Sequence, residues 1–126
     1  MELNKVKTID EILNDTDDIK LGYGGIRIHT GPITENKIYE TAIKTYGINT
    51  QSRVFVEECA EAIVEVMHYF NRGRGTLDDV ASELADVEIM LAQMKLIVNN
   101  EAGEDLVENY KQVKLLRLET NLKEER

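Results

Sequence analysis

The sequence predicts an all-α fold, a small bundle of about four helices preceded by a short glycine-containing N-terminal arm or hairpin. Three observations predict it. After Pro32, apolar residues recur every three to four positions, no further proline occurs, and glycines mark the expected helix ends. The length of 126 residues suits a single domain, with residues 1–33 as the arm and residues 34–126 as the helical core.

The arm, residues 1–33, differs from the rest of the chain in residue usage. Residues 26–29 alternate between apolar and polar side chains, as a strand would, and glycines occupy positions 22, 24 and 25. These glycines are not a phosphate-binding loop, because neither Gly-Lys-Ser nor Gly-Lys-Thr follows and no long helix begins there. We therefore expect a short hairpin or ordered arm.

Four helices are expected after the arm, each bounded by recognisable start and stop signals. Thr34 can cap the first helix, and Gly47 can end it in a left-handed conformation. Thr76 opens the third helix with Asp79 three residues on, which is a capping-box-like arrangement. The expected helices cover, to within a few residues, 34–46, 52–70, 76–99 and 104–123.

The third helix carries an apolar seam that we expect to face the core. Its members alternate in steps of four and three residues: Val80, Leu84, Val87, Leu91, Met94 and Val98. A neighbouring stripe is acidic in its first half and mixed in its second: Glu83, Asp86, Met90, Gln93 and Ile97. Glu83 and Asp86 should therefore lie at the edge of the core, where a partly buried carboxylate needs a cation or hydrogen bonds.

The second helix shows the same pattern, since Glu57, Glu58 and Glu61 stand among apolar residues. Glu58 precedes the loop at residues 71–75 by about as many positions as Asp86 follows it. Antiparallel folding about this short loop should bring four carboxylates together about 12 residues, or roughly 18 Å, from the turn. The converging set is Glu58, Glu61, Glu83 and Asp86.

Converging carboxylates without histidine or cysteine are the ligand set of a hard cation, with Mg²⁺ the expected ion and Mn²⁺ a possible substitute. Such an ion keeps positions open for substrate phosphates and lowers the pKa of a bound water. Glu57 could orient the attacking water, join a second metal, or stay solvated. Either acid pair alone is common on exposed helices, but two pairs at matched height favour a functional site.

The acids also carry a family resemblance. Glu57-Glu58-Cys59-Ala60-Glu61, followed one loop later by Glu83-Leu84-Ala85-Asp86, resembles the hallmark of the MazG-type all-α nucleoside triphosphate pyrophosphohydrolases, and the likeness extends over roughly residues 39–118. It implies hydrolysis of a nucleoside triphosphate to monophosphate and pyrophosphate in nucleotide-pool housekeeping, by a homodimer or homotetramer. It also implies a set of metal ligands: Glu58, Glu61, Glu83 and Asp86. Glu57, Glu58 and Glu61 are the expected catalytic residues.

Four further residues are candidate substrate contacts. Lys114 and Arg117 match positions at which the family carries basic substrate contacts, and Lys111 lies on the same predicted helix. Gln51, just ahead of the predicted second helix, resembles a family position near the base. Cations in a last helix also favour its dipole while staying solvated, which is the simpler explanation of the three basic residues.

Composition narrows the remaining choices. The net charge of −9 argues against binding to a nucleic-acid backbone, and no apolar run is long enough to span a membrane. A single cysteine, Cys59, excludes an intrachain disulfide, so we expect a cytoplasmic protein. Two alternatives remain: a non-catalytic helical interaction module with solvated acids, or a nucleoside di- or triphosphate hydrolase with a different bond specificity.

Overall fold

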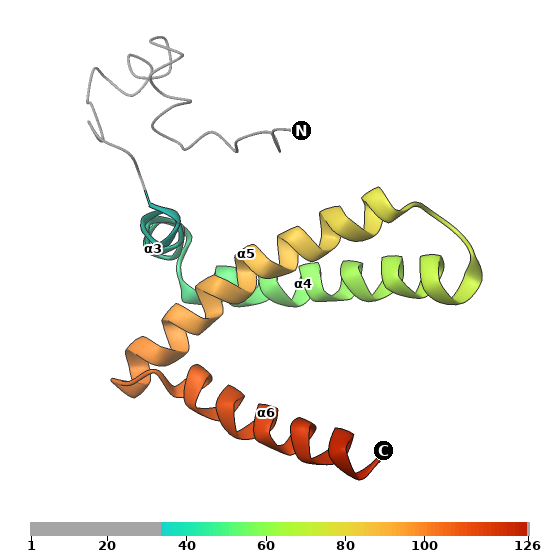
Figure 1. The fold of residues 1–126 in the computed structure, drawn as a ribbon. Helices are drawn as coiled ribbons and strands as arrows, with labels where there is room; N and C mark the ends of the chain where they lie inside the picture. Colours follow the sequence, from blue (N-terminus) through green and yellow to red (C-terminus); the bar gives the residue numbers. More distant parts are fainter. Residues whose placement is uncertain (1–33, 126) are drawn as a thin grey trace. The chain divides into compact units, whose positions relative to one another are not determined.

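The computed structural model describes residues 34–125, so the predicted N-terminal arm lies outside the described residues. Between Ala42 and Ile43 the chain divides into two units, which are described separately. Residues 34–125 form four α-helices, one π-helical turn and no strand, which confirms the predicted all-α class (Figure 1). The elements are α3 (Glu35–Tyr46), α4 (Ile48–Val66), η1 (Met67–Asn71), α5 (Leu77–Ala102) and α6 (Leu106–Glu124).

Helix α3 has the boundaries that its capping residues predict. The backbone N–H of Lys37 donates to Oγ1 of Thr34 at 3.2 Å, which satisfies one of the free donors of the first turn. At the other end Gly47 has φ +91°, a value that favours glycine, and its N–H donates to the carbonyl of Ile43 at 2.8 Å. Thr34 and Gly47 therefore begin and end this helix at the expected positions, although Gly47 has ψ 157° and is not left-handed helical.

Helix α4 begins at Ile48, four residues before the expected start at Ser52. The reason is that Gly47 serves twice: it ends α3 and is also the N-cap of α4, without any side-chain cap. The N–H of Gln51 donates to the carbonyl of Gly47 at 3.0 Å and closes the first turn. The prediction that Gln51 precedes this helix is therefore wrong, because Gln51 lies inside it.

Helix α5 begins with the predicted capping box. The N–H of Asp79 donates to Oγ1 of Thr76 at 3.0 Å, and the N–H of Thr76 donates to Oδ2 of Asp79 at 3.2 Å. The helix continues to Ala102, three residues beyond the expected end, and stops at Gly103 with φ +71°. Gly103 is the first residue after the predicted end that adopts a left-handed conformation without strain.

Helices α4 and α5 pack side by side as an antiparallel hairpin (Figure 1). The face of α5 that is buried contains Val80, Met90, Gln93 and Ile97. Of the predicted core seam, Leu84, Leu91 and Val98 are instead 47%, 43% and 38% exposed. The prediction that the apolar seam faces the core is thus wrong beyond Val80. Helix α5 instead buries the mixed stripe, which was expected at the edge of the core.

The physical reason lies in the polar residues of α4. A single partner helix can cover only one of two adjacent stripes. Helix α4 has the buried Gln51 and the half-buried Glu58 on its inner face, and these side chains need polar or ionic partners. The mixed stripe of α5 offers Gln51 such a partner at Gln93, whereas the apolar seam offers none.

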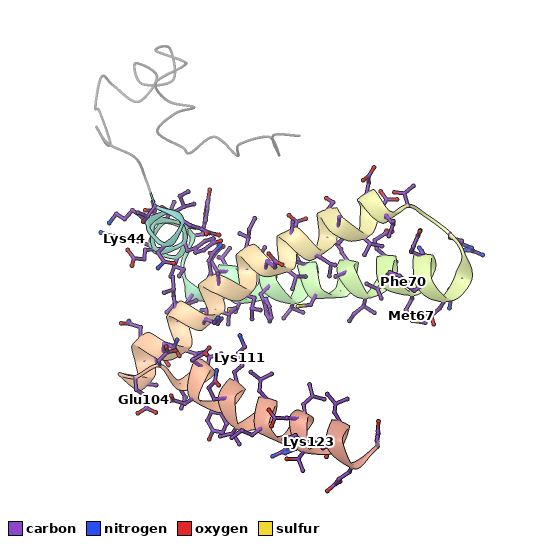
Figure 2. All side chains as sticks on the ribbon, viewed as in Figure 1. Lys44, Met67, Phe70, Glu104, Lys111 and Lys123 are labelled. Atoms are coloured by element: carbon purple, nitrogen blue, oxygen red, sulfur yellow. The ribbon has the colours of Figure 1, made fainter. Side chains whose placement is uncertain are left out.

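Helix α6 contains no buried residue, although it is rich in leucine. It makes a smaller contact with α5, and the two helices enclose a groove of about 620 Å³. Lys111 lies on the side of α6 that faces this groove (Figure 2). Among residues 34–125, no helix has both the length and the apolar content to cross a membrane.

Candidate metal centre

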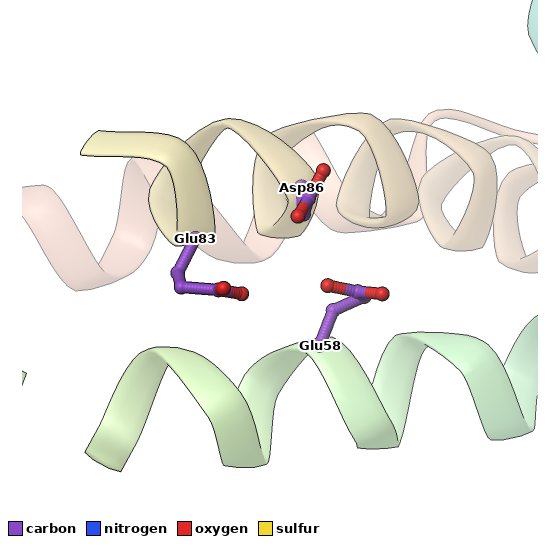
Figure 3. A group of neighbouring side chains, drawn as sticks. All are labelled: Glu58, Glu83 and Asp86. Carbon is purple, nitrogen blue, oxygen red and sulfur yellow. The ribbon is translucent and has the colours of Figure 1, made fainter. Parts of the chain in front are cut away.

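Three carboxylates meet between the helices of the hairpin. Helix α4 supplies Glu58, and α5 supplies Glu83 and Asp86. One carboxylate oxygen from each residue lies within 4.8 Å of the others, so the three could hold a metal ion. Figure 3 shows Glu58 and Glu83 extending into the space between α4 and α5, with Asp86 beside them on α5. We call these three residues the acid triad.

The helical periodicity explains why the triad forms. Glu58 lies seven residues after Gln51 on α4, and Asp86 lies seven residues before Gln93 on α5. Seven residues are about two turns of an α-helix, so each acid shares a helix face with its glutamine. Nε2 of Gln51 donates to Oε1 of Gln93 at 2.7 Å across the hairpin. The same antiparallel register therefore sets Glu58 opposite Asp86.

Glu61, the fourth predicted ligand, lies at the open edge of this group. Its side chain is exposed, and it is not part of the acid triad. Its charge nevertheless acts on Glu58 and Glu83, because it raises the pKa of both carboxyl groups. Beside the triad, an open hollow of about 480 Å³ is lined by Ala60, Glu61, Val64, Glu65 and Glu83. Glu61 is thus positioned to approach a ligand from the solvent side.

The local environment raises the pKa of two of the acids above their ordinary value of 4.5. For Glu58 the main cause is burial, followed by the charges of Glu61, Asp86 and Glu83 and a hydrogen bond to Asp86. For Glu83 burial again comes first, followed by the charge and hydrogen bond of Glu61 and the charges of Asp86 and Glu65. Both environments oppose the charged form of a carboxyl group.

One oxygen of each of these glutamates also lacks a partner. Oε2 of Glu58 and Oε2 of Glu83 are covered by protein and accept no hydrogen bond, although each side chain as a whole is only half-buried. A covered carboxylate oxygen without a partner is unfavourable. A hard divalent cation would satisfy both oxygens and offset the repulsion within the triad, and an all-oxygen donor set is what such cations prefer. The residues present therefore fit a metal of this class.

The structure does not bring the other predicted site residues into the triad. Glu57 is exposed on α4 next to Glu58. Lys111 and Lys114 line the groove between α5 and α6, and Arg117 is exposed on α6. Within residues 34–125, no hydrogen bond or ion pair joins any of these three basic residues to the triad. Their roles as substrate contacts stay predictions.

Two residues near the triad were not among the predicted site residues. Gln93 is the buried partner of Gln51. It could have been predicted from its seven-residue spacing from Asp86, which equals the spacing between Gln51 and Glu58. Glu65 lines the hollow and raises the pKa of Glu83. Its spacing of seven residues from Glu58 places it on the same face of α4.

Comparisons with protein-family models, with curated proteins and with solved structures find no match to this chain. The chemistry of the site therefore has to be argued from its residues and their geometry, together with the spacing of the two acidic motifs.

Proposed function

We propose that the protein is a Mg²⁺-dependent nucleoside triphosphate pyrophosphohydrolase, with Mn²⁺ as a possible substitute. The observation that carries the proposal is the acid triad, in which two helices contribute carboxylates and two covered oxygens have no partner. Glu58, Glu83 and Asp86 would hold the cation, and Glu61 would complete the set from the open edge. The spacing of Glu57-Glu58-x-x-Glu61 and Glu83-x-x-Asp86, which resembles the MazG-type family, supports the choice of reaction.

The proposed reaction cleaves the bond between the α- and β-phosphates. Water adds to one phosphorus, the bridging P–O bond breaks, and the products are a nucleoside monophosphate and pyrophosphate. Bound Mg²⁺ supplies charge stabilisation at the phosphoryl oxygens and lowers the pKa of a coordinated water. Glu57 is exposed beside Glu58 and is the proposed acceptor of the water proton, with Glu61 as a second carboxylate at the open edge.

We also propose that the protein acts as a homodimer or homotetramer. Helix α6 buries none of its residues, and a helix of 19 residues gains little stability in water without tertiary packing. A second copy covering the leucines of α6 would remove them from water. The proposed phosphate contacts belong to this assembled protein: Lys111, Lys114 and Arg117. Gln51 remains a proposed base contact only if its amide can break its hydrogen bond to Gln93.

The proposed compartment is the cytoplasm, where nucleoside triphosphates and Mg²⁺ are both present. The described residues include one free cysteine, Cys59, which is in keeping with a reducing compartment. The substrate is proposed to be a nucleotide, and neither nucleic acid nor membrane is a proposed partner.

One specific observation favours a second candidate, a non-catalytic interaction module. The exposed apolar residues of α6 are what a protein-binding helix would present. In that case the acids have no catalytic role, and α6 alone carries the function. A third possibility keeps the metal site and changes the bond that is cleaved.

Product analysis tests all three possibilities. The purified protein is incubated with canonical and modified nucleoside triphosphates and diphosphates, with Mg²⁺ or with a chelator, and the products are separated. Monophosphate with pyrophosphate, formed only when Mg²⁺ is present, is the expected result. Orthophosphate as the only small product would indicate a different bond specificity. Absence of any turnover, together with full retention of α6-dependent association, would favour the interaction module.

A further inference from the structure

The interior of the hairpin contains two amides where apolar side chains would be expected. Gln51 on α4 is 6% exposed and Gln93 on α5 is 3% exposed. Nε2 of Gln51 donates to Oε1 of Gln93 at 2.7 Å, and Nε2 of Gln93 lies 3.6 Å from the sulfur of Met90. Buried amides are tolerated when they are hydrogen-bonded to one another, and these two satisfy that condition.

This amide pair can distinguish one helix register from its neighbours, which an apolar pair cannot do. One turn before and one turn after Gln93, the buried face of α5 presents Met90 and Ile97. Sliding α4 by one turn in either direction would leave the amide of Gln51 against an apolar side chain without a strong acceptor. A leucine at position 51 would pack against any of the three positions. Single buried polar residues fix register in coiled coils for the same reason.

The acids cannot supply this preference themselves. In the observed register Glu58 faces Glu83 and Asp86, and like charges at such separations repel. Without a cation, the register that assembles the acid triad is therefore opposed by its own electrostatics. Some other contact must favour it before a cation arrives, and the Gln51–Gln93 hydrogen bond is two helical turns away on the same faces.

We propose that the Gln51–Gln93 pair fixes the register of α4 against α5 and thereby preassembles the acid triad as a cation site. The two glutamines are positioning residues, since their side chains hydrogen-bond to each other and to Met90 and not to the triad. The first half of this inference, the register, is independent of the proposed function, and the second half rests on it. The role differs from the base contact predicted for Gln51, because the amide is turned towards Gln93.

The test compares the wild type with Gln51→Leu, Gln93→Leu and the double variant Gln51→Leu/Gln93→Leu. Register is read in the absence of metal, as the distance between two spin labels at Arg53→Cys and Asp78→Cys, both exposed positions that lie at different heights along the hairpin, in a Cys59→Ala background. Thermal melting and titration with Mn²⁺, followed by the signal of free Mn²⁺, complete the set. Gln112→Leu on α6 is the matched control, because it makes the same substitution on an exposed face.

The wild type and Gln112→Leu should give one narrow distance. Each single variant should melt lower than the wild type, because one amide loses its partner. The double variant should melt at or above the wild type, yet show a distance distribution that is broadened or displaced by a few ångströms, since a slip of one turn moves the labels by about 5 Å along the helix axes. Its affinity for Mn²⁺ should fall by about tenfold or more, the scale found when residues that support metal ligands are replaced.

A double variant that keeps the single narrow distance would overturn the register role, whatever its affinity for Mn²⁺. If the wild type binds no Mn²⁺ while the double variant loses the single distance, the register role stands and the proposed metal site fails. If the double variant is displaced in register and still binds Mn²⁺ as tightly as the wild type, the preassembly of the site is refuted. Should the leucine pair not fold, Gln51→Met/Gln93→Met provides the same comparison with more adaptable side chains.

Discussion

The α4–α5 hairpin and helix α6 differ in the contacts that stabilise them. The hairpin has a capping box at Thr76, a hydrogen-bonded glutamine pair in its interior and three carboxylates that converge from both helices. Among the described residues, helix α6 is held to α5 by hydrogen bonds at its first turn only, where Asn99 donates to Oδ1 of Asp105 and accepts from the N–H of Val107, and it buries no residue. The hairpin thus contains specific polar contacts that define one arrangement, whereas α6 offers apolar surface that no described residue covers.

This difference shows where each part obtains its missing stabilisation. The hairpin places acids where a helix pair would normally bury leucines, and its buried apolar residues are only Ala62, Val80, Met90 and Ile97. No large side chain in residues 34–125 is completely buried. A ligand that binds only the folded hairpin should therefore stabilise it. For α6 the missing stabilisation is burial of leucine, which a cation cannot supply.

The largest expected effect concerns the hairpin alone. Glu58→Gln keeps the size of the side chain but removes one charged ligand of the proposed cation. The value of kcat/KM for release of pyrophosphate should fall by about 1,000-fold, within the range that charge stabilisation and proton transfer contribute. Glu88→Gln, an exposed glutamate on the same helix as Glu83, should keep wild-type turnover. Equal rates for Glu58→Gln and Glu88→Gln would remove the triad from the mechanism.

The next prediction concerns α6. Wild-type protein should have at least twice the chain mass of 14.4 kDa when measured by light scattering after size exclusion. Leu115→Lys/Leu118→Lys should raise the dissociation constant of the assembly by at least about 100-fold, because each buried leucine is worth about 1.5–3 kcal/mol.

The same pair of variants separates α6 from the hairpin. Mn²⁺ binding to the triad should persist in Leu115→Lys/Leu118→Lys. Gln112→Lys is the control: it adds a charge to the same helix but replaces an exposed polar residue, so the wild-type mass should be kept. A wild-type mass of 14.4 kDa at high protein concentration would contradict the proposed assembly.

Cation binding should stabilise the hairpin more than α6. At a Mg²⁺ concentration of ten times Kd, the free energy of unfolding should rise by about 1.4 kcal/mol. For a domain of this size that corresponds to a melting midpoint higher by roughly 5 to 10 °C. Hydrogen exchange should show the added protection in α4 and α5 rather than in α6. In Glu58→Gln/Glu83→Gln the same Mg²⁺ addition should leave the midpoint within a degree or so; a full shift in that variant would mean that the ion binds elsewhere.

Much of the hairpin could be predicted because its signals are local. Thr76 with Asp79, and Gly47 after the first helix, determine helix ends through contacts within one turn. The convergence of Glu58 with Asp86 follows from their equal distance to a short loop, which leaves an antiparallel hairpin little other choice. For the same reason Glu83, one turn from Asp86, could be placed near them.

The parts that the sequence did not predict depend on partners. Helix α5 has two adjacent stripes, and periodicity alone does not say which one α4 covers. That choice depends on Gln51 of α4, whose amide needs the amide of Gln93 as its hydrogen-bond partner. The start of α4 was missed because Gly47 caps it without a side chain. For α6, the described residues leave most of its apolar side chains exposed, and its sequence does not show what would cover them.

The smallest expected effect is the pH dependence of the hairpin without metal. The pKa of Glu58 and of Glu83 is raised above 4.5 in the folded protein, so between 4.5 and the folded pKa the folded state binds more protons than the unfolded chain. Their protonation therefore stabilises the fold fully below pH 4.5 and ceases to do so as the pH rises through the folded pKa. Solvent near the half-buried side chains keeps this effect small.

Glutamine does not titrate, so Glu58→Gln/Glu83→Gln should not lose stability as the two acids of the wild type do. The melting midpoint of this variant minus that of the metal-free wild type should therefore increase between pH 4.5 and pH 7. The corresponding difference for Glu88→Gln should not change with pH in this range. Addition of Mg²⁺ at pH 7 should make the melting midpoint of the double variant lower than that of the wild type, because only the wild type binds the cation. A difference that is constant with pH would mean that the triad acids titrate alike in the folded and unfolded protein, and that the hairpin does not hold its carboxylates under mutual repulsion.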